Sequence, residues 1–199
     1  MSSRSAQISR ATKETDVRLS LALDGDGAGE RVTGVGFLDH MLDLLARHGR
    51  LDLDVRVTGD LQTGAHHTAE DTGLALGSAL HEALGDRAGI HRYGHAVVPM
   101  DEARASCAID VSGRPLLVFE AARLPAGVTG GFDHELAEEF FRAVATNARL
   151  TVHLTLEAGT NAHHMIEALF KAFARALRAA TALDPTETGV PSTKGTLTA

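Results

Sequence analysis

Two short motifs hold most of the side chains in this sequence that could do chemistry. Residues 66–70 and 163–167 both read His-His-x-x-Glu, and each motif opens a segment with helical periodicity. Because residues four apart share one face of a helix, the first histidine of each motif lies beside its glutamate, and the second points about 100° away. Imidazole and carboxylate groups on one rigid face are ligands for a divalent cation. A single copy could be a polar helix start, but the duplication predicts a metal site.

The two motifs supply six donors, whereas two ions with four protein ligands each need eight. His40 is the natural seventh ligand, because it begins the helix before the strand that leads to the first motif. For the eighth, the Asp-His pair ending at His134 resembles the pair ending at His40. The repeat register, which aligns Arg50 with Arg149, instead places Glu139 opposite His40. Helix-to-strand geometry follows register, so we favour Glu139, a carboxylate that suits Mn²⁺, and keep His134 as the alternative.

Composition narrows the class of protein. The chain has 199 residues, of which 44% are hydrophobic, and a formal charge of −7, which argues against nucleic-acid binding. Cys107 is the only cysteine, so an internal disulfide is ruled out and a reducing cytosol fits. No apolar run is long enough to span a membrane, and Met1 precedes polar residues without the apolar stretch of a secretion signal. We therefore expect a cytoplasmic protein with neither nucleic acid nor a membrane as partner.

The hydrophobic pattern predicts a duplicated fold. Strands are expected at residues 7–23 (one or two strands), 51–57, 94–99, 104–111, 115–121 and 149–156, and helices up to about 48, over 66 to about 84, over 134–147 and from 163 to before 184. Strands–helix–strand–helix thus occurs twice without a linker, in approximate repeats 7–88 and 89–184, followed by a polar substrate-binding tail, 185–199. Fused repeats of this kind form two sheets with helices packed on one face, so we predict one α+β domain over residues 1–199.

Seven segments carry motifs in a fixed order along nearly the whole chain. They are residues 12–15, 36–42, 66–71, 110–115, 161–164, 170–172 and 192–195. Together they resemble the imidazoleglycerol-phosphate dehydratase family of histidine biosynthesis, in its monofunctional form. The resemblance implies a fold similar to domain 2 of ribosomal protein S5, two Mn²⁺ ions per site, and a 24-mer built from trimers with sites at subunit interfaces.

The same resemblance assigns roles to residues. The implied metal ligands are His40, His66, His67, Glu70, His163, His164 and Glu167, and Glu139 stands where many members have histidine. The implied catalytic carboxylates are Glu14, Glu70 and Glu167. The implied substrate contacts are Glu14, His40, His48, His66, Glu70, Arg92, Arg114, His163, Lys171, Ser192, Thr193 and Lys194.

The implied reaction removes water from D-erythro-imidazole glycerol phosphate and gives imidazole acetol phosphate. The hydrogen lost sits on an unactivated carbon, so a carboxylate alone would be too slow, whereas a metal-bound ring nitrogen is easier to deprotonate. Glu14, which is not needed as a ligand, is expected to move a proton. Arg92, Arg114 and Lys194 lie in turns and are expected to grip the phosphate, with Ser192 adding a hydroxyl.

Two other functions share part of this pattern. A dinuclear metal hydrolase of a phosphorylated metabolite would use the same ligands to activate a water molecule. A non-enzymatic metal-binding module would explain the two motifs but not Glu14, the arginines in turns or the Ser-Thr-Lys tail.

Overall fold

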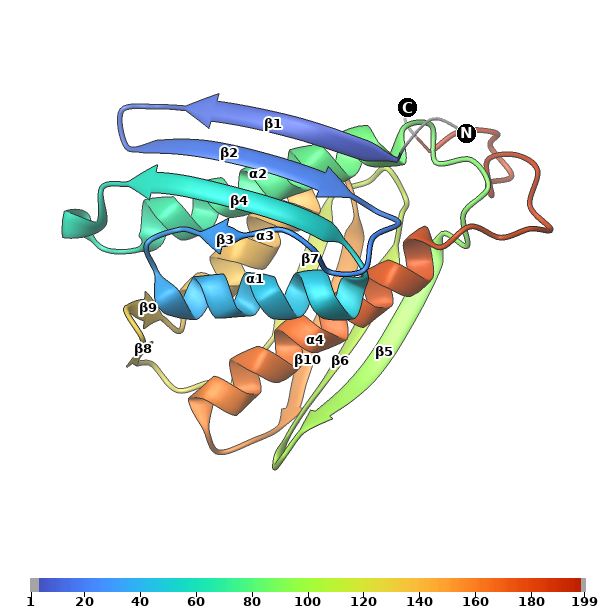
Figure 1. The fold of residues 1–199 in the computed structure, drawn as a ribbon. Coiled ribbons are helices and arrows are strands. Elements are labelled where there is room, and N and C mark those ends of the chain that lie inside the picture. Colours follow the sequence, from blue (N-terminus) through green and yellow to red (C-terminus); the bar gives the residue numbers. More distant parts are fainter. Residues whose placement is uncertain (1–3, 198–199) are drawn as a thin grey trace.

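Two four-stranded sheets enclose the helices of this chain, and a computed structural model describes residues 4–197 of it (Figure 1). The first sheet has the order β1-β2-β4-β3, with β1 (Ser5–Ala11), β2 (Thr15–Ala22), β3 (Arg31–Val32) and β4 (Asp52–Gly59). The second has the order β5-β6-β10-β7, with β5 (Tyr93–Met100), β6 (Ala103–Asp110), β7 (Leu116–Glu120) and β10 (Thr151–Ala158). In both sheets only the last pair in this order is parallel. The two halves of the chain therefore share one topology.

The structure has several short elements that the hydrophobic pattern did not predict. The two-residue strand β3 and the 3-10 helix η1 (Leu61–Thr63) were not predicted. A hairpin of β8 (Val128–Thr129) and β9 (Phe132–Asp133) lies where no strand was predicted. Such elements are too short to leave a periodic signal in the sequence. The last two residues of the predicted tail lie outside the described residues.

Four helices carry most of the candidate ligands. They are α1 (Gly36–Gly49), α2 (His66–Leu84), α3 (Leu136–Ala148) and α4 (Ala162–Thr181). Helices α1 and α3 end at Arg50 and Arg149, which adopt left-handed conformations with φ of 56° and 53°. These equivalent C-caps support the alignment of the two repeats by register. At the start of α4 the side chain of Asn161 accepts hydrogen bonds from the backbone N–H groups of His163 and His164, which fixes the second motif.

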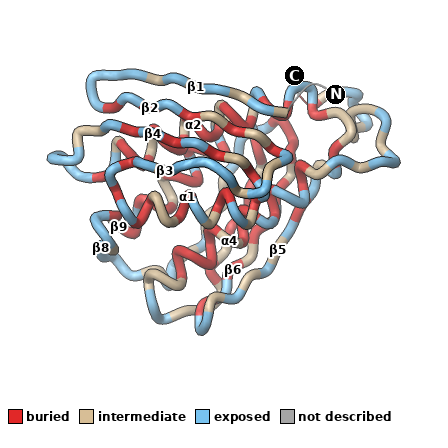
Figure 2. Tube along the Cα trace, viewed as in Figure 1, coloured by how far each residue is buried: buried red, intermediate tan, exposed pale blue. Residues whose placement is uncertain are grey.

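Each sheet is covered by helices on one face only. Along β2, for example, Val17, Leu19 and Leu21 are buried while the residues between them are exposed or half-buried. Helix α2 packs on β1 and β2, α4 packs on β5 and β6, and the helices of the two halves meet as the pairs α1–α4 and α2–α3. The tube in Figure 2 shows this layering, with buried helices between strands whose outer faces are accessible. The predicted α+β architecture is confirmed.

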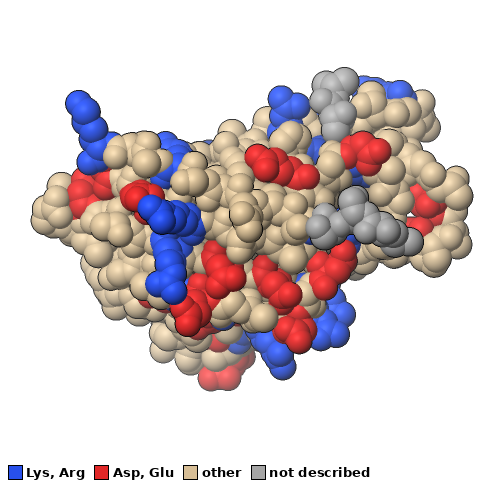
Figure 3. Space-filling view, turned by 45° about the horizontal axis from the view of Figure 1, so that its top comes forward, with Lys and Arg blue, Asp and Glu red and all other residues tan. Residues whose placement is uncertain are grey.

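The surface is charged with both signs. On the face drawn in Figure 3, acidic and basic side chains are interspersed. Within residues 4–197, no helix combines the length and apolar character needed to cross a membrane. Cys107 is buried at 3% exposure on β6, as expected for a small hydrophobic residue in a strand.

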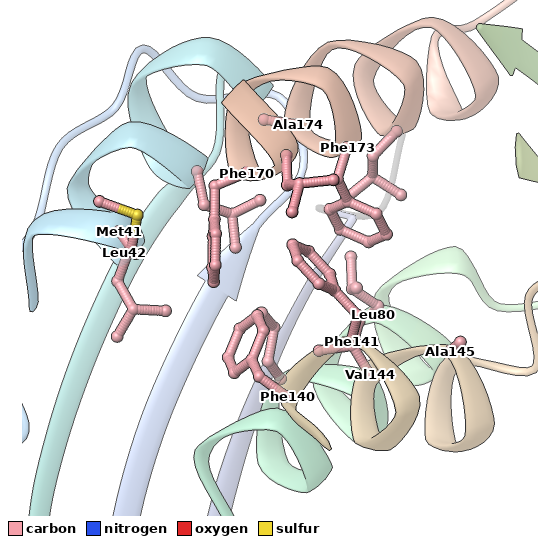
Figure 4. Packing of buried hydrophobic residues seen from close by; sticks show 14 of the residues in the cluster. Met41, Leu42, Leu80, Phe140, Phe141, Val144, Ala145, Phe170, Phe173 and Ala174 are labelled. Carbon is pink, nitrogen blue, oxygen red and sulfur yellow. The ribbon is translucent and has the colours of Figure 1, made fainter. Parts of the chain in front are cut away.

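An aromatic cluster joins the two helix pairs in the core. Phe170 of α4 lies 5.1 Å from Phe140 and 4.6 Å from Phe141 of α3, measured between ring centroids. Phe173 lies 5.1 Å from Phe141, and all four rings are fully buried (Figure 4). Truncating a buried phenylalanine to alanine typically costs about 3–5 kcal/mol, so these rings fix α3 and α4 relative to each other.

Helices α2 and α3 approach each other closely because α2 has glycine at the contact. A Cβ added at Gly73 would lie 2.8 Å from the carbonyl oxygen of Phe140, and one added at Gly77 would lie 2.7 Å from that of Val144. Both contacts advance by four residues, so the two helices run parallel. By the same pairing, α3 begins level with Ala69, about one turn after the start of α2.

Candidate metal and substrate site

One cluster of predicted ligands draws on both repeats. His40 lies near the start of α1, and His163 and Glu167 lie one turn apart at the start of α4. One ligand atom from each of the three lies within 4.8 Å of the other two. Nε2 of His163 is 3.3 Å from Oε2 of Glu167, and Nε2 of His40 is 4.0 Å from it. The contact between α1 and α4 thus brings a ligand of the first repeat to the second motif.

Glu167 is held as a charged carboxylate in this cluster. Its side chain is 8% exposed, and Nζ of Lys171 lies 2.6 Å from Oε1. Burial alone would raise the pKa of Glu167, but the hydrogen bond and charge of Lys171, with the nearby histidines, keep it below its usual value. His48 belongs to the same region, since burial lowers its pKa and the charges of Lys171 and Arg175 add to this effect. The cluster therefore presents a negative oxygen toward two imidazoles.

The first motif is looser. Nε2 of His66 lies 3.8 Å from Oε2 of Glu70, and the glutamate side chain is 44% exposed. The residue four positions after Glu70 is Leu74, so this carboxylate has no equivalent of the Lys171 contact. Helix α3, which packs against α2, carries Glu139 in its first turn, within one turn of the level of Glu70. Oε2 of Glu139 lies 4.0 Å from Nε of Arg142.

His134 makes contacts of a different kind. The residue is buried at 6% exposure, with Nδ1 2.8 Å from the carbonyl oxygen of Pro125 and Nε2 2.9 Å from Oγ1 of Thr129. Because a ligating histidine needs an unprotonated ring nitrogen that is free to face the ion, these bonds favour a structural role. They add a physical reason for preferring Glu139, which stays a prediction.

Two carboxylates that the sequence reasoning missed hold the second histidine of each motif. Nδ1 of His67 lies 3.1 Å from both carboxylate oxygens of Asp60, and Nδ1 of His164 lies 2.8 Å from Oε2 of Glu102. These hydrogen bonds raise the pKa of both histidines and lower the pKa of Glu102 to about 2. A carboxylate on one ring nitrogen orients the other toward a metal. Asp60 and Glu102 follow strand ends at irregular distances from the motifs, so no spacing rule in the sequence identifies them.

The hairpin turns place one more carboxylate beside each motif. Oε1 of Glu14, in the β1–β2 turn, is 3.9 Å from Nε2 of His67. Oδ2 of Asp101, in the β5–β6 turn, is likewise 3.9 Å from Nε2 of His164. The predicted proton-transfer residue therefore lies next to a predicted ligand, and the second repeat has an acidic counterpart that was not predicted.

The predicted phosphate contacts gather at a second location. The side chain of Arg92 donates to both carboxylate oxygens of Asp110 and, through Nη1, to the carbonyl oxygen of Pro191 at 2.8 Å. Nη2 of Arg114 lies 3.6 Å from Oδ2 of Asp110. The tail runs past both arginines and presents Ser192, Thr193 and Lys194 in a turn closed by the Gly195 N–H donating to the Ser192 carbonyl oxygen at 2.9 Å. An arginine has five N–H donors, so Arg92 keeps two beyond these bonds.

The two locations lie at opposite ends of the molecule. His163 is in the first turn of α4, whereas the tail begins after its last residue, Thr181. A helix of this length spans about 30 Å at 1.5 Å per residue, and Figure 1 shows the tail at the far end of α4 from the motif. One chain therefore brings together His40, His163 and Glu167, but not these ligands and its own Lys194.

The donor sets fit divalent metal ions. Ring nitrogens of His40 and His163 converge on the carboxylate of Glu167. His67 and His164 each have one ring nitrogen held by a carboxylate, the arrangement common around protein-bound metals. Mixed nitrogen and carboxylate donors suit Mn²⁺ and neighbouring divalent ions.

Sequence comparisons relate the chain to one enzyme family. Residues 33–177 match the family model of imidazoleglycerol-phosphate dehydratase. The chain is 59% identical over 197 residues to the dehydratase of Symbiobacterium thermophilum, covering 99% of this chain and 94% of the relative. It is 55% identical to that of Jannaschia sp., covering 98% of this chain and all of the relative.

Solved structures agree as well. The crystal structure of the dehydratase from Staphylococcus aureus superposes with a TM-score of 0.82 at 44% identity, covering 90% of this chain and 99% of that one. The enzyme from Pyrococcus furiosus, solved in complex with (S)-C348, gives a TM-score of 0.82 at 37% identity, covering 96% of this chain and 100% of that one. The chain therefore belongs to the imidazoleglycerol-phosphate dehydratase family, whose members are hydro-lyases of histidine biosynthesis.

Proposed function

We propose that this chain converts D-erythro-imidazole glycerol phosphate to imidazole acetol phosphate and water in the cytoplasm, and that the reaction needs two divalent metal ions, most simply Mn²⁺. The observation that carries the metal requirement is the convergence of His40, His163 and Glu167 across the α1–α4 contact. We propose that His164, whose Nε2 is left free by the contact of Nδ1 with Glu102, completes this set. The parallel contact of α2 and α3 supports a second set.

That second set consists of His66, His67, Glu70 and Glu139. When bound, the metal ions supply Lewis-acid stabilisation of negative charge on the substrate imidazole. The side chains of this chain do the rest. Lys171 keeps Glu167 ionised as a ligand, and we propose that it also contacts the substrate, together with His48.

Glu14 is proposed to transfer the proton that leaves carbon. It lies in an exposed turn 3.9 Å from Nε2 of His67, close enough to reach a ring held at the first motif. Arg92, Arg114 and Lys194, with the hydroxyls of Ser192 and Thr193, are proposed to bind the phosphate. Charge-assisted hydrogen bonds from several donors then fix the substrate at its far end.

The separation of the two locations supports a site shared between copies of the chain. A substrate whose phosphate and imidazole lie a few bonds apart cannot bridge the length of α4. We therefore propose that the tail of one copy meets the ligands of another, in the 24-mer of trimers that the family resemblance implies. The outer face of the second sheet supports such contacts, because Tyr93, Val97 and Leu116 are 60%, 59% and 50% exposed there.

One assay tests the reaction. The purified protein is given imidazole glycerol phosphate with Mn²⁺, and ketone formation and phosphate release are followed together. We expect a ketone product without phosphate release, and complete loss of activity after verified metal removal. Phosphate release would indicate a hydrolase, and full activity of metal-free protein would exclude the metal requirement.

Mixing two defective variants tests the shared site, at a substrate concentration too low for Lys194→Ala alone to turn over measurably. Glu167→Gln removes a metal ligand, and Lys194→Ala removes a phosphate contact. If the two residues serve one site from different chains, random reassembly of an equal mixture restores about one quarter of the sites. If both residues came from the same chain, no mixed site would be intact and activity would stay absent.

A further inference from the structure

A buried arginine closes the tail end of the molecule. Arg87 follows α2 in a turn, at φ of 65°, and has no exposed surface. Nη1 donates to the carbonyl oxygen of Leu197 at 2.9 Å, and Nη2 donates to that of Ala148 at 2.9 Å. Nη2 also lies 3.2 Å from Nδ1 of His81. Arg87 is thus surrounded by carbonyl and imidazole groups in place of a carboxylate, and its buried Nε has no hydrogen-bond partner in residues 4–197.

Such a charge is costly to bury, so the groups around it matter. A buried charge is tolerated when it is hydrogen-bonded to groups of opposite polarity. Ala148 is the last residue of α3, and the carbonyls at a helix C-terminus carry the negative end of the helix dipole. This part of the contact caps α3. The bond to Leu197 has no such explanation, because it reaches across the sequence to the tail.

The tail is anchored on both sides of its Ser-Thr-Lys turn. Before the turn, Arg92 donates to the carbonyl oxygen of Pro191. After it, Leu197 is 4% exposed and its carbonyl oxygen fits against Gly113, where an added Cβ would lie 1.9 Å away. Gly113 precedes Arg114 directly. The Leu197 anchor therefore fixes the tail beside one phosphate arginine and the Pro191 anchor fixes it beside the other.

We propose that Arg87 is a positioning residue for phosphate binding, acting by holding Leu197 so that the turn at Ser192–Lys194 stays beside Arg92 and Arg114. This inference rests on the proposed function, which gives that turn its ligand. Without the anchor, the turn would have to be ordered at every binding event, and affinity would fall by that cost. The phosphate is bound alike in the ground and transition states, so the effect falls on KM more than on kcat.

Two variants approach the anchor from its two sides. Arg87→Lys keeps the charge but cannot reach both carbonyls with one ammonium group. Leu197→Ala removes buried side-chain surface from the tail and keeps the carbonyl oxygen that Arg87 binds. In each, we expect KM to rise about tenfold, kcat to change less than about threefold, and inhibition by inorganic phosphate to weaken in parallel with KM. The effects of the two changes should not add in the double variant, because both act on one anchor.

A matched glycine pair gives a control. Gly113→Ala places a Cβ against the Leu197 carbonyl, whereas Gly131, at a similar φ of 80°, has open space around it. Gly131→Ala carries only the backbone strain, so KM and the inhibition constant of inorganic phosphate should stay at the wild-type values. Gly113→Ala should raise both KM and this inhibition constant.

Hydrogen exchange of residues 189–197 tests the anchor without any assay of turnover. We expect faster exchange in Arg87→Lys and Leu197→Ala, with metal content and the exchange of α4 unchanged. Folded variants with wild-type KM, phosphate inhibition and tail exchange would overturn the proposal, and Leu197→Ala decides alone if Arg87→Lys does not fold. A wild-type protein without dehydratase activity would refute the proposed function, and phosphate binding and tail exchange would still decide the role of Arg87.

Discussion

The two His-His-x-x-Glu helices have the same motif, but the chain prepares them differently. In α4 the start is capped by Asn161, and the buried carboxylate of Glu167 forms an ion pair with Lys171. In α2 the position equivalent to Asn161 is Gly64, no side chain caps the helix, and the side chain of Glu70 is 44% exposed. The side chains of the α4 set are therefore more constrained by their surroundings than those of the α2 set.

This difference predicts unequal metal sites. Ligands that are ordered by the fold lose little conformational entropy when they bind an ion, whereas loose ligands lose more. The α4 set should therefore bind its ion more tightly than the α2 set. The two halves share the motif, and the surrounding residues determine how each copy is used. The predictions below test this inequality, starting with the largest effects.

Removing one ligand from each set should have the largest effect. His40→Ala should abolish the tighter of two metal-binding steps, and Glu139→Ala the weaker. Activity should fall on the order of a thousandfold or more in both, because several kcal/mol of stabilisation by a metal ion is lost. Calorimetric titration with Mn²⁺, checked by elemental analysis, measures the two steps. Loss of the weaker step in His40→Ala would reverse the proposed order of the sites.

His134→Ala is the matched control for Glu139→Ala, since both residues lie at or just before the start of α3. It should keep two ions per site and lose only stability, because the ring binds Pro125 and Thr129 within its own loop. If His134→Ala loses an ion while Glu139→Ala keeps both, the eighth ligand is His134. The Asp-His pair in the sequence would then have predicted that ligand better than the repeat register.

A change at Glu14, in the β1–β2 turn, should have the next largest effect. Glu14→Gln keeps the size of the side chain but removes the basic carboxylate, so kcat should fall about a hundredfold or more with metal content intact. Asp16→Asn, two residues along the same hairpin, removes an exposed carboxylate and should leave kcat unchanged. Near-normal kcat in Glu14→Gln would direct attention to the second repeat, where Asp101 holds the equivalent position.

The carboxylates that orient His67 and His164 should have a smaller and pH-dependent effect. Asp60→Asn or Glu102→Gln should lower metal affinity about 10- to 100-fold at high pH. In the wild type both histidines have raised pKa values, so a proton competes with the metal from above pH 6.5 downward, and affinity falls as the pH falls. In Asp60→Asn the onset of proton competition at His67 should move down toward pH 6.5. Metal titrations at several pH values would contradict this if the onset did not move.

The metal-free protein gives an independent measurement of the second pair. Because the pKa of His164 is raised, its contribution to stability is complete below pH 6.5 and is lost as the pH rises through the raised value. Because the pKa of Glu102 is lowered to about 2, its contribution is present above about 4.5 and is lost as the pH falls toward 2. Glu102→Gln should therefore reduce the free energy of unfolding mainly between about pH 4.5 and the raised pKa of His164, as measured by denaturant titration.

The smallest predicted effect concerns packing and leaves the chemistry alone. Gly73→Ala would normally favour a helix, but the new Cβ lies 2.8 Å from the Phe140 carbonyl oxygen, so overpacking should cost about 1–3 kcal/mol of unfolding free energy. Gly36→Ala, in α1, meets no atom within 4 Å and should be neutral or slightly stabilising. Thermal denaturation of the two variants gives the comparison, and a stable Gly73→Ala would show that α2 and α3 separate easily.

Periodicity and register were enough to predict most of the fold. Alternating strands, helical spacing and the Arg50–Arg149 alignment indicated two equivalent halves, and the structure has the same sheet order twice. The contact of His40 with Glu167 depends on how α1 packs against α4, which no local pattern encodes. Asp60 and Glu102 escaped prediction for the same reason, because turns bring them to the motifs from places without a spacing rule. The distance between the motifs and the tail is likewise a property of helix direction.

The close contact at Gly73 also bears on how the two halves can change over time. The position equivalent to Gly73 in α4 is Phe170, whose ring fills the space beside Phe140 and Phe141. One half thus carries a small residue and the other a large residue at the same place in the repeat. A chain made of two identical first halves would lack this ring, and one made of two identical second halves would have a ring where helix backbones must touch. The two halves are therefore not interchangeable, and a side chain as large as phenylalanine at position 73 would need a compensating change in α3.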